Sequence, residues 1–265
     1  MSATKLKLKN EILYIIVLLF VTEAFNYAVL RTSFKYLLIL GVLALLILEL
    51  WFVRTFILYS RKKISKYSDV VMKISLKRRF FQYFILPALF YTSLLLFLYF
   101  NRNILLGHFV IVICVSFVLL LFLNVKSSLN KYYSVALATR TIFDFICITT
   151  LYLLLNSYLR IGFSMWEFIF LSFVSSLVLL ISILKIHDKF GSLEFLIAII
   201  SSVIVSLSML AVWNNNILVI PSVGALSFYL ITSFWNLRFA GRTKFTDYLY
   251  PVVYVLLALS LILTV

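Results

Sequence analysis

Acids and arginines inside apolar stretches are the residues of this sequence that could do chemistry. A charged side chain at the centre of a membrane helix costs about 2.5–3.5 kcal/mol on insertion scales. Such residues persist where pairing or a function offsets that cost. Asn26 follows Glu23, the first of the acids, by about one helical turn. The candidate intramembrane polar cluster comprises Glu23, Asn26, Glu49, Arg54, Arg140 and Asp144.

The spacing of these residues predicts two layers of opposite charge. A helix rises about 1.5 Å per residue. Counted from the expected cytoplasmic ends of their membrane spans, Glu23, Glu49 and Asp144 lie about 14–16 Å into the membrane, near the bilayer midplane. Arg54 and Arg140 lie about 8 Å up by the same count. Arg140 and Asp144 share a helix face and can pair, whereas Glu49 and Arg54 face different neighbours. The sequence therefore predicts acids above arginines, spread over three helices.

Two interpretations of this cluster remain open. In the structural one, acids and arginines neutralise each other as buried pairs, and Arg54 extends to the inner surface. In the functional one, the first, second and fifth helices enclose a polar cavity in which a carboxyl binds a proton or a cation. Burial favours the neutral carboxyl and nearby arginines favour the charged one, so the two effects oppose each other.

The positions of the other reactive side chains are explained without a functional site. His108 lies about one turn into the fourth apolar run, where a hydrogen bond at its tip or an interfacial position accounts for it. Cys114 and Cys147 lie in apolar runs and are expected to be small hydrophobic residues rather than a disulfide or metal ligands. Phosphate-loop, G-x-S-x-G and H-E-x-x-H motifs do not occur. We expect no metal and no cofactor, and the sequence favours no catalytic activity.

The composition predicts helices packed in lipid to position these residues. Of 265 residues, 64% are hydrophobic and 12% are charged, whereas a soluble domain is about half apolar and a quarter charged. A membrane helix needs about 20 apolar residues. We predict an all-α, polytopic transmembrane helix bundle of about nine spans, forming a single integral membrane domain over residues 1–265. The expected spans are Ile12–Leu30, Tyr36–Tyr59, Phe80–Phe100, Ile104–Val125, Val135–Tyr158, Met165–Ile186, Leu193–Trp213, Ile217–Trp235 and Tyr248–Thr264.

Three features within the spans affect how the helices run and pack. The first run has a basic start, as a signal peptide does, but its far end lacks a small-x-small cleavage site, so we expect a retained span. Pairs of serines four residues apart, in the sixth and seventh spans, let helix backbones approach closely. Pro87 and Pro221 fall inside the third and eighth spans, where each is expected to remove a backbone hydrogen bond.

The distribution of lysine and arginine predicts the orientation. One side receives the N-terminal lysines and most of the loop lysines and arginines. The other side holds only Arg31, Lys35, Arg102 and Arg160. Because basic loops stay inside, the N-terminus is expected in the cytoplasm and the C-terminus outside, in a cell membrane of the plasma or inner type. The net charge of +15 is then concentrated on one face of the membrane. Because it does not belong to a folded basic domain, we expect no nucleic-acid partner.

The longest loop, residues 60–79, has the pattern of a basic amphipathic helix on the cytoplasmic surface. Ile64, Tyr67, Val71 and Ile74 fall on one side at helical spacing, opposite a stripe of lysines. Each basic residue contributes about 1 kcal/mol of attraction to an anionic leaflet. An orientation signal is favoured over specific lipid recognition, and docking of a cytoplasmic partner stays open. The candidate contacts to anionic lipid head groups are Arg61, Lys62, Lys63, Lys66, Lys73, Lys77, Arg78 and Arg79.

Three functions compete. The first is a small permease or flippase-like carrier, linked to protons or ions through Glu23, Glu49 or Asp144. The second is a membrane-embedded enzyme whose arginines hold the phosphate of a lipid-linked substrate. The third is a non-catalytic membrane subunit or assembly factor whose charges pair with another membrane protein. The sequence does not identify the molecule that is moved, modified or bound.

Overall fold

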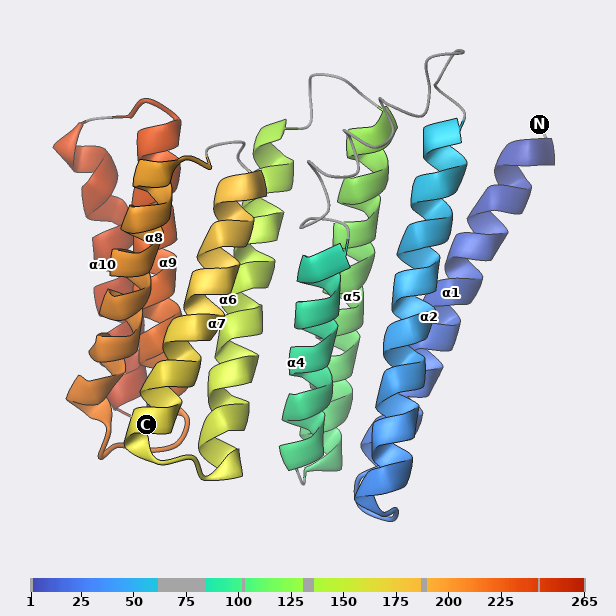
Figure 1. The fold of residues 1–265 in the computed structure, drawn as a ribbon, viewed down its shortest axis with the longest axis horizontal. Helices are drawn as coiled ribbons and strands as arrows, with labels where there is room; N and C mark the ends of the chain where they lie inside the picture. The colour runs from blue at the N-terminus through green and yellow to red at the C-terminus, as the bar shows by residue number, and fades with distance from the viewer. Residues whose placement is uncertain are drawn as a thin grey trace. The chain divides into compact units, whose positions relative to one another are not determined.

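The structure, a computed structural model, describes residues 2–61, 84–101, 103–130, 136–186, 190–242 and 244–264. Within these residues the chain forms nine α-helices, a short 3-10 helix and no strand (Figure 1). The prediction of an all-α helix bundle is confirmed. The helices are α1 (Ser2–Ala28), α2 (Phe34–Arg61), α4 (Leu86–Phe100), α5 (Ile104–Asn130), α6 (Ala136–Ile161), α7 (Met165–Ile186), α8 (Ser192–Ser208), η2 (Met209–Val212), α9 (Val219–Phe239) and α10 (Phe245–Leu263).

Seven of the described helices, α2 and α5 to α10, are long and apolar enough to cross a membrane. The apolar parts of α1 and α4, Ile12–Ala28 and Leu86–Phe100, are shorter. Each of these helices coincides with one of the expected spans. The protein is therefore a multi-pass membrane protein, and which end of each helix faces the cytoplasm stays a prediction.

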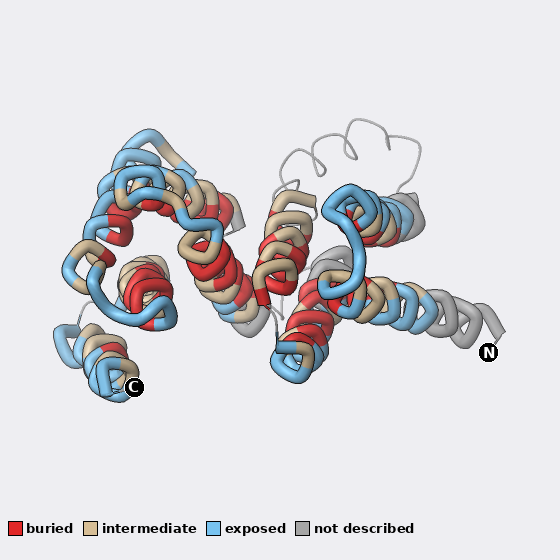
Figure 2. The backbone as a smooth tube through the Cα atoms, turned by 90° about the horizontal axis from the view of Figure 1, so that it is seen from below, coloured by how far each residue is buried: buried red, intermediate tan, exposed pale blue. Residues whose placement is uncertain are grey.

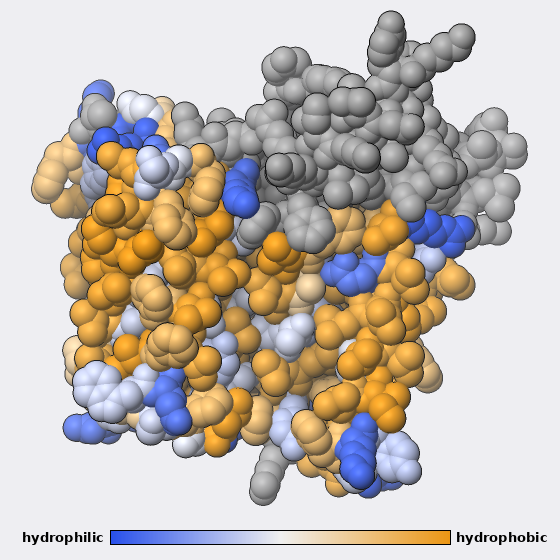
Figure 3. Space-filling view, in the orientation of Figure 1, coloured by the Kyte–Doolittle hydropathy of each residue, from blue (hydrophilic) through white to orange (hydrophobic). Residues whose placement is uncertain are grey.

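Large apolar side chains are exposed along the described helices. Phe109 is 72% exposed and Trp166 is 73% exposed. On the face of α7 and α8 seen in Figure 3, apolar side chains cover the middle of the helices, and hydrophilic ones gather at their ends. A monomeric protein in water rarely exposes apolar patches of this extent. This distribution is the one that a lipid environment selects.

The chain divides into two compact units, residues 1–143 and 144–265. In the first unit, α1 packs against α2, α4 and α5. In the second unit, α7 packs against α8, α8 against α9, and α9 against α10. Buried residues follow one side of most of these helices (Figure 2). The single integral membrane domain expected over residues 1–265 stays a prediction, because the structure defines the packing within each unit.

The connection between α6 and α7 is fixed by local hydrogen bonds. Gly162 follows α6 with a φ of 84°, a left-handed conformation that costs glycine little. Before α7, the Ser164 backbone N–H and hydroxyl both donate to Glu167 Oε2, at 2.8 and 2.7 Å. The N–H contact is one half of a capping box, which satisfies a backbone donor ahead of the first turn.

The structure differs from the sequence-based expectation at one proline and at one helix end. Pro87 is the second residue of α4 and Pro221 the third residue of α9. In a first turn the missing N–H has no partner within the helix, so the expected loss of a hydrogen bond at Pro221 is wrong. At Pro87 the expectation stays a prediction, because the two residues before α4, Phe84 and Ile85, are π-helical. Pro251, by contrast, lies inside α10. The expected span Leu193–Trp213 is an α-helix only to Ser208, because its last turn tightens into the 3-10 helix η2.

Candidate functional site

A buried hydrogen bond joins α1 to α4 next to the first acid of the chain. Thr22 and Tyr91 are both fully buried. The Thr22 hydroxyl donates its one hydrogen to the Leu18 carbonyl at 2.6 Å. The Tyr91 hydroxyl, 2.6 Å from Thr22 Oγ1, is therefore the donor in that contact, because a hydroxyl has a single O–H. This bond fixes the part of α1 from which Glu23 projects.

On the other side of Glu23, α1 and α5 approach closely at Asn26 and Gly107. Asn26 is only 3% exposed, and a Cβ at position 107 would overlap its side-chain amide. Glycine at 107 is therefore a requirement of the packing. Within the described part of the chain, Asn26 Nδ2 has no hydrogen-bond partner. A buried donor thus lies one helical turn from Glu23.

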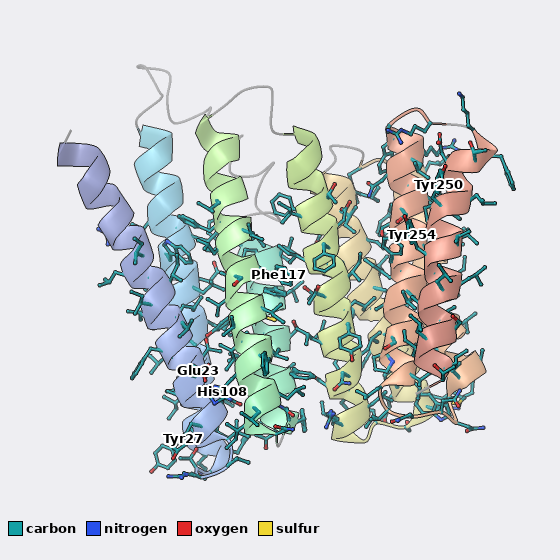
Figure 4. All side chains as sticks on the ribbon, turned by 180° about the vertical axis from the view of Figure 1, so that it is seen from behind. Glu23, Tyr27, His108, Phe117, Tyr250 and Tyr254 are labelled. Atoms are coloured by element: carbon teal, nitrogen blue, oxygen red, sulfur yellow. The ribbon has the colours of Figure 1, made fainter. Side chains whose placement is uncertain are left out.

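This packing brings Glu23 against His108. The distance from Glu23 Oε2 to His108 Nδ1 is 2.6 Å, within the range of a charge-assisted hydrogen bond. The Glu23 side chain is 25% exposed and the His108 side chain 47%. Figure 4 shows the two side chains meeting between α1 and α5, near the end where Tyr27 lies. The sequence identified Glu23 as a candidate but gave His108 no partner.

The pair lies closer to a helix end than the midplane position expected for Glu23. Glu23 is five residues before Ala28, the last residue of α1, and His108 is the fifth residue of α5. At 1.5 Å per residue, both lie about 6–8 Å from that end. The expected inner end, Ile12, is also not where the helix begins, because α1 continues back to Ser2.

The two candidates on α2 have different surroundings. Glu49 is partly exposed, yet its Oε1 is buried and has no hydrogen-bond partner among the described residues. Arg54 Nη1 donates to the Tyr14 hydroxyl of α1 at 3.0 Å, and its guanidinium lies 5.9 Å from the centre of that ring. Arg54 therefore contacts α1 through a tyrosine.

In the second unit, Asp144 joins α6 to α9. Asp144 is 6% exposed, and its Oδ2 accepts a hydrogen bond from Asn236 Nδ2 at 2.6 Å. Asn236 was not a candidate from the sequence, since it lies near the end of an expected span. The predicted pairing of Asp144 with Arg140 falls outside the described side chains, because only the backbone of Arg140 is described.

The predicted anionic-lipid contacts fall almost entirely outside the described residues. Arg61 ends α2 and its side chain is not described, and the other seven residues lie between 62 and 83. Over the described ranges, no group of three or more His, Cys, Asp or Glu side chains could hold a metal ion. Cys114 and Cys147 are free and buried.

Replacing Gly107 with alanine is expected to destabilise the protein, because the new methyl group displaces the Asn26 amide. Overpacking of this kind costs about 1–3 kcal/mol, or about 2–12 °C in the thermal midpoint. The measurement is the thermal midpoint in detergent. The matched control is Gly41→Ala, since a Cβ at 41 meets Leu95 and Phe25 at an ordinary 3.6 Å. Helix propensity makes that control neutral or stabilising, and an equal loss in both variants would contradict the close approach.

Comparison with family models, curated proteins and solved structures finds no match to this chain. What the structure establishes is the class: a multi-pass helical membrane protein with a carboxylate–imidazole pair between two of its helices.

Proposed function

We propose that this protein is a small permease-type carrier coupled to protons, with the Glu23–His108 pair as its proton-binding site. The observation that carries the proposal is the 2.6 Å contact between a carboxylate and an imidazole within the membrane-spanning part of α1 and α5. Ionisable groups at such positions are expensive and are retained for ion or proton pathways.

The chemistry of the pair suits reversible proton binding. A carboxylate and an imidazole at hydrogen-bond distance hold one proton between them, and imidazole is the side chain that changes charge most readily near neutral pH. With the imidazole neutral, the pair carries one negative charge, and one bound proton makes it neutral overall. The pair therefore has two charge states that differ by one proton.

Access to the pair supports the same proposal. A pair that served only to neutralise buried charge would be enclosed, whereas His108 is 47% exposed and Glu23 25%. The pair also lies about 6–8 Å from the helix ends, where water of the interface reaches. The amide of Asn26, one turn away, is a buried donor without a hydrogen-bond partner among the described residues.

Each unit also holds a carboxyl within a helix, apart from the pair. Glu49 of α2 has a buried oxygen without a hydrogen-bond partner among the described residues. Asp144 accepts from the neutral amide of Asn236. The lipid-linked enzyme has less support, because the guanidinium of Arg54 lies against Tyr14.

The proposal predicts proton flux that depends on Glu23. Purified protein is reconstituted into liposomes that contain a pH-sensitive dye, and an imposed pH gradient is followed in time. Glu23→Gln is expected to lower the rate at least about tenfold, since removing a positioned proton acceptor typically costs about 10²–10⁴.

Asp247→Asn is the matched control, because it removes a carboxyl in the first turn of α10. It is expected to leave the flux unchanged. Wild-type flux equal to that of empty liposomes, across a series of added small solutes, would contradict the carrier. Unchanged flux in Glu23→Gln would remove the pair from the mechanism.

A further inference from the structure

A cavity of about 360 Å³ lies at one end of α7, α8 and α9. This volume falls within the range of about 300–1,000 Å³ typical of small-ligand sites. Leucine and isoleucine side chains from α7 and α8, among them Leu184 and Ile197, form an apolar wall. Trp235 and Phe239 of α9 add aromatic rings. Tryptophan is enriched at the depth of lipid head groups.

Two opposite charges complete the lining. Glu194 lies in the first turn of α8 and Arg238 in the last turn of α9. Within the part of the chain that the structure describes, neither side chain forms a hydrogen bond or an ion pair. Among the described residues, the cavity thus presents an unpaired carboxylate and an unpaired guanidinium beside an apolar wall.

The helix end that carries Arg238 is held in place by the backbone. Gly241 adopts a φ of 71°, its N–H donates to the Arg238 carbonyl at 3.0 Å, and the next N–H donates to the Leu237 carbonyl at 3.0 Å. These two bonds form a Schellman motif, which ends α9 at a defined residue. On the facing helix, the Glu194 side chain lies against Gly191, the residue before α8.

We propose that this cavity binds a zwitterionic phospholipid whose head group carries a primary amine, as in phosphatidylethanolamine. Arginine suits the phosphate, which it contacts with two parallel N–H groups. The Glu194 carboxylate accepts hydrogen bonds from the ammonium, and the apolar wall contacts the first carbons of the acyl chains. The site is independent of the proton-binding pair and of the carrier function.

The charge pattern predicts an order among lipids. A choline head group has the same charges but no N–H to donate to the carboxylate, so it binds more weakly. A glycerol head group carries no positive charge and leaves Glu194 facing an anionic lipid, so it binds least. Preference for an amine lipid over an anionic lipid is unexpected for a basic protein, for which charge alone favours the reverse.

The test is native mass spectrometry of the purified protein in detergent, with phosphatidylethanolamine, phosphatidylcholine, phosphatidylglycerol or soluble phosphoethanolamine added at equal concentration. We expect about tenfold more bound phosphatidylethanolamine than phosphatidylglycerol. Arg238→Gln lowers phosphatidylethanolamine binding about tenfold. Glu194→Gln removes the preference for phosphatidylethanolamine over phosphatidylcholine.

Matched controls come from the same end of the second unit. Arg242→Gln and Asp247→Asn remove charges that do not line the cavity, and they are expected to leave the lipid order intact. Equal binding of the three lipids, or an equal effect of Arg242→Gln and Arg238→Gln, would overturn the site. Binding of soluble phosphoethanolamine as strong as that of the lipid would overturn the lipid as its ligand. If Arg238→Gln fails to fold, the site is tested by Glu194→Gln alone. Retained preference for phosphatidylethanolamine over phosphatidylcholine in that variant would overturn the site.

Discussion

Replacement of Trp51 with alanine is expected to lower the thermal midpoint of the purified protein by about 6–20 °C. Trp51 is 2% exposed. The centroid of its ring lies 4.2 Å from that of Phe122 on α5 and 6.0 Å from that of Tyr14 on α1. Phe52 packs edge-on, with its ring centroid at 5.7 Å. One side chain therefore holds three helices of the first unit together.

The expected loss of stability comes from lost packing contacts rather than from the hydrophobic effect. Lipid is as apolar as the core, so helices in a bilayer associate through close van der Waals contact. Alanine removes those contacts and leaves a cavity that the neighbouring rings fill only in part. Truncation of a buried tryptophan costs about 3–5 kcal/mol by this account.

The control for Trp51→Ala is Leu50→Ala on the preceding residue of α2. Leu50 is 60% exposed, so its truncation removes few internal contacts and improves helix propensity. We expect a change of less than about 2 °C there, since surface substitutions stay within about 0.5 kcal/mol. A loss of similar size in both variants would contradict the role of the aromatic cluster.

A double-mutant cycle between Glu23 and His108 is expected to show that the two act as one proton-binding unit. Glu23→Gln and His108→Gln each lower proton flux at least about tenfold. The double variant is expected to be no slower than either single one, because groups that act as a unit lose their shared effect at the first substitution. The measurement is the initial rate of dye response in proteoliposomes at matched protein content.

Size-exclusion profiles of the three variants separate this effect from misfolding, since glutamine keeps the volume and the polarity of both sites. Tyr27→Phe, one turn from Glu23 and 49% exposed in the wild type, is the nearby control and is expected to keep full flux. Additive losses in the double variant would show that Glu23 and His108 act separately.

Most of the fold could be predicted because lipid leaves the backbone no other partner. With no water in the bilayer core, each apolar run must satisfy its own N–H and C=O groups, which a helix does. The expected runs therefore coincide with the described helices. The ends were harder to predict, as at Ser208, because a final 3-10 turn depends on local contacts and not on hydropathy.

The partners of the charged residues could not be predicted, because they depend on which helices meet. Glu23 and His108 lie 85 residues apart in the chain, and nothing in their spacing joins them. A signal was present nonetheless, since Glu23 lies seven residues before the end of the first expected span and His108 four residues after the start of the fourth. The Lys and Arg distribution predicts that these two span ends lie on the same side of the membrane. Asp144 and Asn236 show the same difficulty, because an asparagine near a span end is ordinarily hydrated.

Four buried serines of the neighbouring helices α7 and α8 form hydrogen bonds within their own helices. Ser172 and Ser176 of α7 are buried, and each donates to a carbonyl of its own helix. Ser202 and Ser206 of α8 do likewise. None of these four hydroxyls fixes the axial register of the two helices by a hydrogen bond to the neighbouring helix. A small step of one helix along the other therefore breaks none of these four bonds, and the proposed carrier function would use that freedom when the site changes the side to which it opens.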